Sequence, residues 1–170
     1  MLPYATERLS FREMTPEDAP ALLQIWGDPE TMRFYPSPKS ATEMSGWVQR
    51  MVQRYRDDGI GLWIIESHEG DFIGDCGLTW QSVNGRTVLE VGYHVHPARQ
   101  RSGLAAEAAA ACVELARRRF APITITAIIH PDNAASRRVA EKLGMTHTED
   151  DIAHPWITRT VMSMRLHSAA

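Results

Sequence analysis

The sequence predicts an α/β domain in which helices pack on a mixed β-sheet. Helical spacing of apolar residues dominates residues 15–58, and strand-like segments dominate residues 62–95. Two strand-to-helix junctions then follow in series. The 170 residues, of which 44% are hydrophobic, suffice for one substantial core, and no linker or repeat interrupts them. We therefore expect a single domain over residues 1–170.

The chain begins with one predicted strand and two predicted helices. Residues 8–14 alternate in polarity, as a half-buried strand does. Thr15 is the expected N-cap of the first helix, and the proline that follows it suits the first turn. Ser40 and Glu43 form a capping box for the second helix, which Asp58–Gly59 ends.

The middle of the chain is predicted to be sheet. Residues 62–67 and 71–80 are rich in apolar residues and flank a short turn, which indicates a hairpin. The dipeptide Asn84–Gly85 favours a second tight turn, which leads into a strand over residues 88–95.

Helices and strands alternate in the last part of the chain. A helix is expected over about residues 103–119, and the almost uniformly apolar residues 123–130 suit a central strand. A short helix over residues 132–145, a loop over 148–157 and a strand over 158–166 complete the chain. The predicted order of elements is therefore βααβββαβαβ.

Composition and charge exclude several classes of partner. The net charge of −3 gives no general attraction to nucleic acid. No apolar run approaches the length of a membrane span, and the first ten residues do not resemble a signal peptide. Cys76 and Cys112 lack CxxC spacing, which indicates small buried residues in a reducing compartment. We expect a cytoplasmic protein that binds neither nucleic acid nor membranes.

The first strand-to-helix junction carries the stretch QRSGLA, residues 100–105. A helix N-terminus offers unpaired N–H groups and a partial positive charge, so this junction suits an anion. Gly103 allows close approach of the backbone, and the N–H groups of about Arg101 to Ala106 would converge on a phosphate, with Arg99 and Arg101 adding charge. The stretch is neither a Walker loop nor a GxGxxG motif. Taken alone, it is equally compatible with an ordinary turn before an alanine-rich helix.

The second junction follows the predicted central strand. Asn133 is expected to be the N-cap of the short helix, and Ser136 is a polar residue in its first turn. Both junctions open at the carboxyl ends of their strands, which is where α/β sheets bind ligands.

Together the two junctions resemble the two core motifs of the GNAT acetyltransferase superfamily. The likeness is closest to the branch that includes ribosomal-protein N-terminal acetyltransferases, and it extends over nearly the whole chain. The residues that meet the motifs are Gln100, Gly103, Ala105, Asn133, Ser136, Lys142, Leu143 and Gly144. The resemblance implies the GNAT fold, a mixed and mostly antiparallel sheet with helices on both faces.

The resemblance also implies acetyl-coenzyme A as the acetyl donor. In the family the turn wraps the pyrophosphate, and the pantetheine arm lies where the strand before the turn parts from the next strand. The coenzyme-binding residues that it implies are Tyr93, His94, Val95, Gln100, Arg101, Ser102, Gly103, Leu104, Ala105, Ala106 and Asn133.

Two residues are the candidate catalytic groups. Many relatives carry a Tyr where this chain has Ala140, so the resemblance moves the role of acid for the departing thiolate to Ser136. Glu90 shares a strand face with Gly92 and His94, where its carboxylate can take a proton from an amine through water. A Glu on a half-exposed strand face explains the residue equally well.

No metal site is predicted. His94, His96 and His130 stand at the ends of predicted strands, but their spacing matches no zinc signature. We expect direct attack of a free amine on the thioester, with the oxyanion held by a backbone N–H near Val95.

The expected function is acetyl-coenzyme A-dependent N-acetyl transfer to a primary amine. The acceptor is either a protein N-terminus or a small molecule such as an aminoglycoside, polyamine or amino acid, and the sequence does not decide between them. A non-catalytic sensor that binds acyl-coenzyme A is the alternative from another class. A monomer and a homodimer are both compatible with the sequence.

Overall fold

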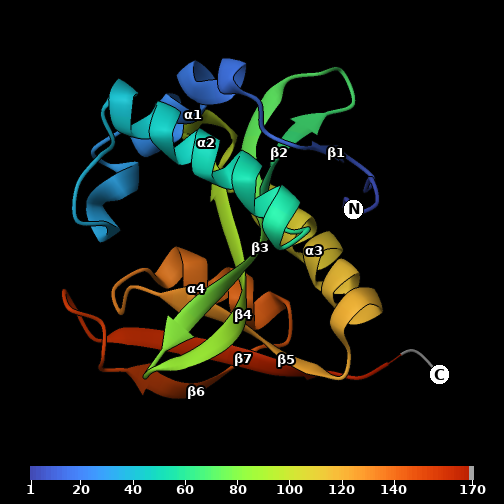
Figure 1. The fold of residues 1–170 in the computed structure, drawn as a ribbon, viewed down its shortest axis with the longest axis vertical. Coiled ribbons are helices and arrows are strands. Elements are labelled where there is room, and N and C mark those ends of the chain that lie inside the picture. Colours follow the sequence, from blue (N-terminus) through green and yellow to red (C-terminus); the bar gives the residue numbers. More distant parts are fainter. Residues whose placement is uncertain (169–170) are drawn as a thin grey trace.

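The computed structural model describes residues 1–168 and contains one seven-stranded sheet with the strand order β1-β2-β3-β4-β5-β7-β6 (Figure 1). The elements are β1 (Leu9–Arg12), η1 (Pro16–Asp18), α1 (Ala19–Trp26), η2 (Thr31–Phe34), α2 (Ala41–Asp57), β2 (Leu62–Ser67), β3 (Phe72–Val83), β4 (Arg86–Val95), η3 (Pro97–Arg99), α3 (Leu104–Phe120), β5 (Ile123–Ile129), α4 (Ala134–Lys142), β6 (Thr146–Asp151) and β7 (Arg159–Leu166).

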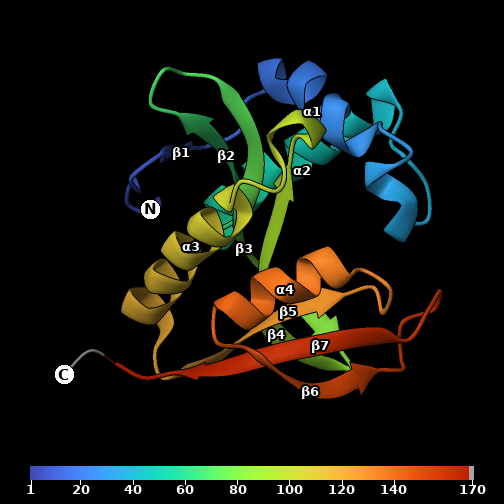
Figure 2. The same cartoon turned by 180° about the vertical axis from the view of Figure 1, so that it is seen from behind.

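The sheet is mixed and mostly antiparallel, which confirms the predicted fold class. Only the β4–β5 pair is parallel; the other neighbouring strands are antiparallel. Helices α1 and α2 cover one face, and α3 and α4 cover the other (Figures 1 and 2). Each face has its own buried cluster, one around Leu22, Ile25 and Val48 and the other around Ala108, Cys112 and Leu115.

The predicted helix caps form as the residue types indicate. Ser40 and Glu43 make a reciprocal capping box at the start of α2. Asn133 caps α4, because its side-chain oxygen accepts the N–H of Ser136. Gly103 precedes α3 with φ +84°, a left-handed conformation that glycine adopts without steric cost.

Two sequence-based assignments differ from the structure. The helix expected directly after Thr15 begins with the separate 3-10 turn η1 before α1. The predicted loop over residues 148–157 contains most of β6, an edge strand with the sequence THTEDD. The side chains of this strand are largely exposed, so its sequence shows no apolar alternation. The strand is held by its pairing with β7, by the buried and ion-paired Asp151, and by the contacts of Glu149 with Arg86 and Asn84. The observed order is βααβββαβαββ.

Strands β4 and β5 part shortly after they meet. Their parallel pairing consists of Leu89 with Ile125 and Glu90 with Thr126. Beyond Glu90, β4 continues to Val95 paired only with β3, and β5 continues to Ile129 paired with β7. The backbone edges that face each other across this gap are thus left open in the middle of the sheet.

The two cysteines are buried side by side between β3 and α3. Their Sγ atoms lie 3.6 Å apart as free thiols, and burial raises the pKa of the Cys76 thiol. This confirms that both are small buried residues. Within residues 1–168, no helix combines the length and the apolar character that crossing a bilayer requires.

Candidate functional site

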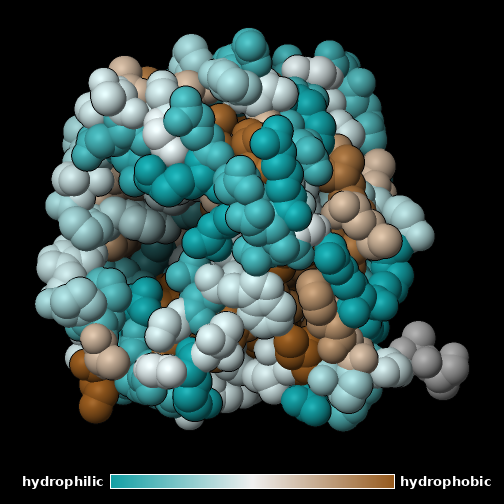
Figure 3. Space-filling model, viewed as in Figure 1, coloured by the Kyte–Doolittle hydropathy of each residue, from teal (hydrophilic) through white to brown (hydrophobic). Residues whose placement is uncertain are grey.

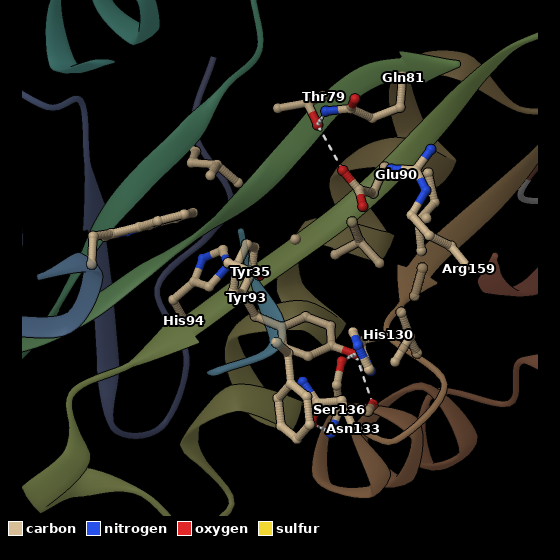
Figure 4. A pocket seen from close by; sticks show the side chains of 18 of the residues that line it. Tyr35, Thr79, Gln81, Glu90, Tyr93, His94, His130, Asn133, Ser136 and Arg159 are labelled. Atoms are coloured by element: carbon tan, nitrogen blue, oxygen red, sulfur yellow. Dashed lines mark hydrogen bonds between the residues drawn. The ribbon is translucent and has the colours of Figure 1, made fainter. Parts of the chain in front are cut away.

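A cavity of about 430 Å³ opens where β4 and β5 part. Its walls come from β4 and β5, from α2, from the loop after η2, from the start of α4 and from the segment before β7 (Figure 4). Figure 3 shows this face hollowed below α2, with mostly hydrophilic residues around the opening. The cavity is large enough for the reacting end of a small ligand.

The open edge of β4 presents backbone groups to the gap. The N–H of His96 donates to the carbonyl of Ile73 on the β3 side. Because successive strand residues direct their N–H groups to opposite neighbours, the N–H of Val95 points away from β3 and toward the gap. The carbonyl of Val95 points the same way and accepts a hydrogen bond from Nε2 of Gln100 at 2.9 Å. Gln100 thus ties the end of β4 to the turn that follows.

The turn over residues 100–106 has the shape that an anion site needs. Arg101 and Gly103 both have positive φ, +64° and +84°, which turns neighbouring N–H groups toward one side at the start of α3. The turn is braced from outside: Arg8 donates to the carbonyl of Ser102 and pairs with Glu107. Arg99 pairs with Asp71, whereas Arg101 makes no ion pair within residues 1–168. Arg101 is therefore the turn residue whose charge is available to a ligand.

Glu90 lies on the wall of the cavity at the point where β4 and β5 separate (Figure 4). Its Oε2 accepts a hydrogen bond from Thr79 Oγ1 at 3.2 Å. Burial raises the pKa of Glu90, opposed by the Thr79 hydrogen bond and by His94 and Arg159. A carboxyl group with a raised pKa is better matched to taking up a proton near neutral pH than an exposed Glu.

Ser136 and Tyr93 form a pair of hydroxyl groups on the opposite wall. Ser136 Oγ donates to Tyr93 Oη at 3.1 Å, and Tyr93 Oη donates to the carbonyl of Ser136 at 2.9 Å. Burial raises the pKa of Tyr93, which keeps its phenol protonated. Ala140 is fully buried and does not line the cavity. The hydroxyl of Tyr93 was missed as an acid candidate, although its strand position directs it toward α4.

A second chain of hydrogen bonds crosses the cavity wall on the α1 side. Asp75 Oδ1 lies 2.8 Å from His94 Nδ1, and Tyr35 Oη lies 2.8 Å from His94 Nε2. The second carboxylate oxygen of Asp75 accepts the Trp26 indole N–H at 2.8 Å. Burial, together with Glu90 and Asp75, raises the pKa of Tyr35. Asp75 and Tyr35 were not among the predicted site residues.

The predicted residues therefore fall into two groups that share one groove. Glu90, Tyr93, His94, Asn133 and Ser136 line the cavity. Those of the turn lie next to it, and they are Gln100, Arg101, Ser102, Gly103, Leu104, Ala105 and Ala106, with Val95 between the two groups. Of the other two histidines at predicted strand ends, His96 bonds to Gln24 outside the cavity, whereas His130 lines the cavity and packs on the ring of Phe34 (Figure 4).

Comparison with known proteins identifies the same fold. A family model described as "Acetyltransferase (GNAT) domain" matches residues 8–146. The "Uncharacterized protein YkkB" of Bacillus subtilis is 34% identical over 148 residues, which are 85% of each chain. An acetyltransferase from Agrobacterium tumefaciens superposes with a TM-score of 0.83 at 23% identity, covering 97% of this chain and 95% of that one. RimL, the ribosomal L7/L12 alpha-N-protein acetyltransferase solved with coenzyme A, superposes with a TM-score of 0.78 at 15% identity, covering 98% and 99%.

Proposed function

The chain belongs to the GNAT acetyltransferase family, and we propose that it is a single-domain N-acetyltransferase that transfers the acetyl group of acetyl-coenzyme A to a primary amine. The match to this family confirms the resemblance that the sequence predicted. The chain is therefore an acyltransferase, and acetyl-coenzyme A is its cosubstrate. The observation that carries the proposal is the parting of β4 and β5 over a cavity, directly before a turn shaped for an anion.

The turn over residues 100–106 is proposed to hold the pyrophosphate. Its N–H groups stand at the start of the 17-residue helix α3, where the helix dipole favours negative charge. Ser102 and Gly103 are both exposed, and the Arg8 guanidinium beside them adds a second positive charge near the proposed phosphate position. Arg101 supplies a positive charge that no acidic residue within residues 1–168 takes up.

The pantetheine arm is proposed to lie in the gap between β4 and β5. The arm carries amide groups, and the open edge of β4 offers the matching N–H and C=O groups of Tyr93. With the pyrophosphate at the turn, the arm runs along this edge and brings the thioester to the cavity. The N–H of Val95 then stabilises the oxyanion that forms when the carbonyl is attacked.

The amine attacks the thioester carbonyl directly in this proposal. An alkyl amine is mostly protonated near neutral pH, and only the free base attacks, so Glu90 takes the first proton through a water molecule. Placement of the two reactants beside each other supplies most of the acceleration. The new C–N bond forms, the C–S bond breaks, and the thiolate leaves toward the wall formed by Tyr93 and Ser136.

The acceptor enters on the side lined by α2 and the loop after η2. Aromatic rings form much of this entrance: Trp26, Phe34, Tyr35, Trp47 and Trp156. Arg50 and Arg54 of α2 line it as well. We propose that the acceptor entering here is a primary amine, either of a protein N-terminus or of a small molecule.

A thiol-release assay tests the proposed function. Purified protein is mixed with acetyl-coenzyme A and a panel containing peptides with free N-termini, amino acids, polyamines and aminoglycosides, and free thiol is measured over time. We expect release that depends on one class of amine, with the acetylated amine identified by mass spectrometry. Coenzyme binding without release for any amine would instead support a sensor.

Replacement of Ser136 by Ala should lower turnover and leave coenzyme affinity nearly unchanged. The hydroxyl faces Tyr93, whereas the cap of α4 uses the backbone N–H of Ser136, so the helix start survives the change. Because a thiol with a pKa near ~8.5 is a fair leaving group, we expect a loss of about tenfold. Steady-state kinetics and calorimetry measure the two effects.

Two further variants distinguish a catalytic role of the Ser136 hydroxyl from a structural one. Tyr93→Phe removes the partner hydroxyl and should reduce turnover in the same direction. Ser45→Ala removes an exposed serine hydroxyl that donates to the carbonyl of Ala41 within α2, and it should change neither value. Normal turnover with a lower melting temperature in Ser136→Ala would assign the hydroxyl a structural role only.

A further inference from the structure

We infer that Tyr35 is a further catalytic residue, which takes a proton from the attacking nitrogen and passes its own proton to His94, and that Asp75 is the positioning residue for His94. The inference rests on the proposed function, because it assigns a step of amine acetylation. It is carried by a continuous chain of three groups, Asp75, His94 and Tyr35, each 2.8 Å from the next, that ends in the cavity. Figure 4 shows the last two of them, His94 and Tyr35, at the cavity.

The hydrogen bonds of Asp75 determine which nitrogen of His94 carries the proton. Asp75 is fully buried, and its carboxylate accepts from the Trp26 indole on one oxygen and lies against His94 Nδ1 on the other. A carboxylate only accepts hydrogen bonds, so Nδ1 must hold a proton. Neutral His94 therefore has a free electron pair on Nε2, and the Tyr35 hydroxyl donates to it. The oxygen of Tyr35 keeps its own electron pairs for the cavity.

The surroundings hold this chain in place and bury its Asp75 end. The indole of Trp26 packs on the ring of His94 with 4.2 Å between centroids, and it also contacts the rings of Tyr35 and Trp47. Tyr35 remains 37% exposed at the cavity entrance, so its hydroxyl belongs to both the chain and the acceptor side. A rigid, half-enclosed arrangement of this kind is suited to proton transfer in a fixed direction.

The proton balance of the reaction requires a second proton acceptor besides Glu90. An ammonium group carries three protons and the amide product keeps one, so two must leave the nitrogen. Glu90 is proposed to take the first, which generates the free amine. The second leaves as the C–N bond forms: the N–H bond breaks, a new O–H bond forms on Tyr35, and the former Tyr35 proton moves to His94 Nε2. The resulting imidazolium faces the Asp75 carboxylate, and it returns its proton to water through Tyr35 after product release.

The need for Glu90, which takes the first proton, depends on pH, whereas the need for Tyr35, which takes the second, does not. At high pH the amine arrives without its first proton, so Glu90 becomes dispensable, but the second proton must still leave. Asp75, Glu90 and Tyr93 are the titratable groups nearest to Tyr35 and His94. Lys39 lies above Trp26, and the other charged or titratable groups of the cavity are Arg50, Arg54, His130, His154 and Arg159. None of these replaces the contact of Tyr35 with Nε2.

The test is Tyr35→Phe, which removes one oxygen from a residue at the cavity entrance. We expect kcat with the best amine to fall on the order of 100-fold, with a much smaller change in KM, and we expect the deficit to persist at high pH. Tyr4→Phe, at an exposed tyrosine against Arg118, is the matched control and should behave as wild type. Wild-type kcat in Tyr35→Phe, or a deficit that disappears at high pH, would overturn the inference.

His94→Gln and Asp75→Asn test the rest of the chain. Each should lower kcat in the same way as Tyr35→Phe, and combining either with Tyr35→Phe should add little, because all three belong to one path. Fully multiplicative losses would contradict a shared path. The activity of the wild-type protein separates the two claims: an inactive wild type contradicts the proposed function, whereas an active wild type with an equally active Tyr35→Phe contradicts only the relay.

Discussion

Replacement of Gly103 by Val should reduce the affinity for acetyl-coenzyme A about 100-fold or more. Gly103 has φ +84°, which a β-branched residue adopts only with strain, so the turn must change shape. Loss of two hydrogen bonds to a charged phosphate, at about 1.5 kcal/mol each, corresponds to such a factor. A Val side chain would also stand where the phosphate approaches. Calorimetric titration with acetyl-coenzyme A measures the effect.

Gly85→Val is the matched control for this prediction. Gly85 also has a positive φ, +77°, and lies in the β3–β4 turn at the other end of β4. A Cβ at Gly85 would meet open space, and a Cβ at Gly103 would make only ordinary van der Waals contact, 3.6 Å from Nη2 of Arg8. The control should lose stability to a similar degree and keep the affinity for the coenzyme. Unchanged affinity in a folded Gly103→Val protein would remove the assignment of the pyrophosphate to this turn.

Replacement of Glu90 by Gln should lower turnover roughly 10- to 1000-fold near neutral pH, the range typical for loss of a general base. The change keeps the shape of the side chain and removes its ability to take a proton. Because burial raises the pKa of Glu90, the acid limb of the wild-type pH profile should lie above the pH at which an exposed Glu titrates. The deficit should shrink at high pH, where the amine arrives deprotonated.

Turnover measured across that pH range, with Glu66→Gln as the control, checks this prediction. Glu66 is also a strand glutamate, but it lies on β2, pairs with Arg12 of β1 and does not line the cavity. Its replacement should leave the pH profile unchanged. Wild-type turnover in Glu90→Gln at every pH would show that the first proton leaves by another route, such as solvent or a different carboxylate.

Local sequence patterns predict most of the fold because they reflect local interactions. The capping box of α2 and the Asn133 cap of α4 depend on residues within one helical turn, and both form as expected. Strand β6 could not be predicted in the same way. Its side chains are mostly exposed, so no apolar pattern marks it. Its buried Asp151 is stabilised by Arg159 and by the backbone N–H of Asn84, which is distant in sequence.

In the candidate site, too, residues in local motifs could be predicted and residues joined by distant contacts could not. The turn over residues 100–106 and the start of α4 are continuous motifs, so their residues were named from the sequence. The partners of His94 were not, because Asp75 lies 19 residues before it and Tyr35 lies 59 residues before it. No pattern along the chain connects a loop tyrosine, a buried aspartate and a strand histidine; only the sheet register and the packing of α1 bring them together.

A crystal structure of the protein with coenzyme A is the most direct test of the proposed site. We predict that the pyrophosphate contacts the backbone N–H groups within residues 101–106 and that the pantetheine arm lies between β4 and β5. Its sulfur should then reach the cavity between Glu90 and the hydroxyl groups of Tyr93 and Ser136. A coenzyme bound elsewhere, with the gap between β4 and β5 unoccupied, would contradict the proposal.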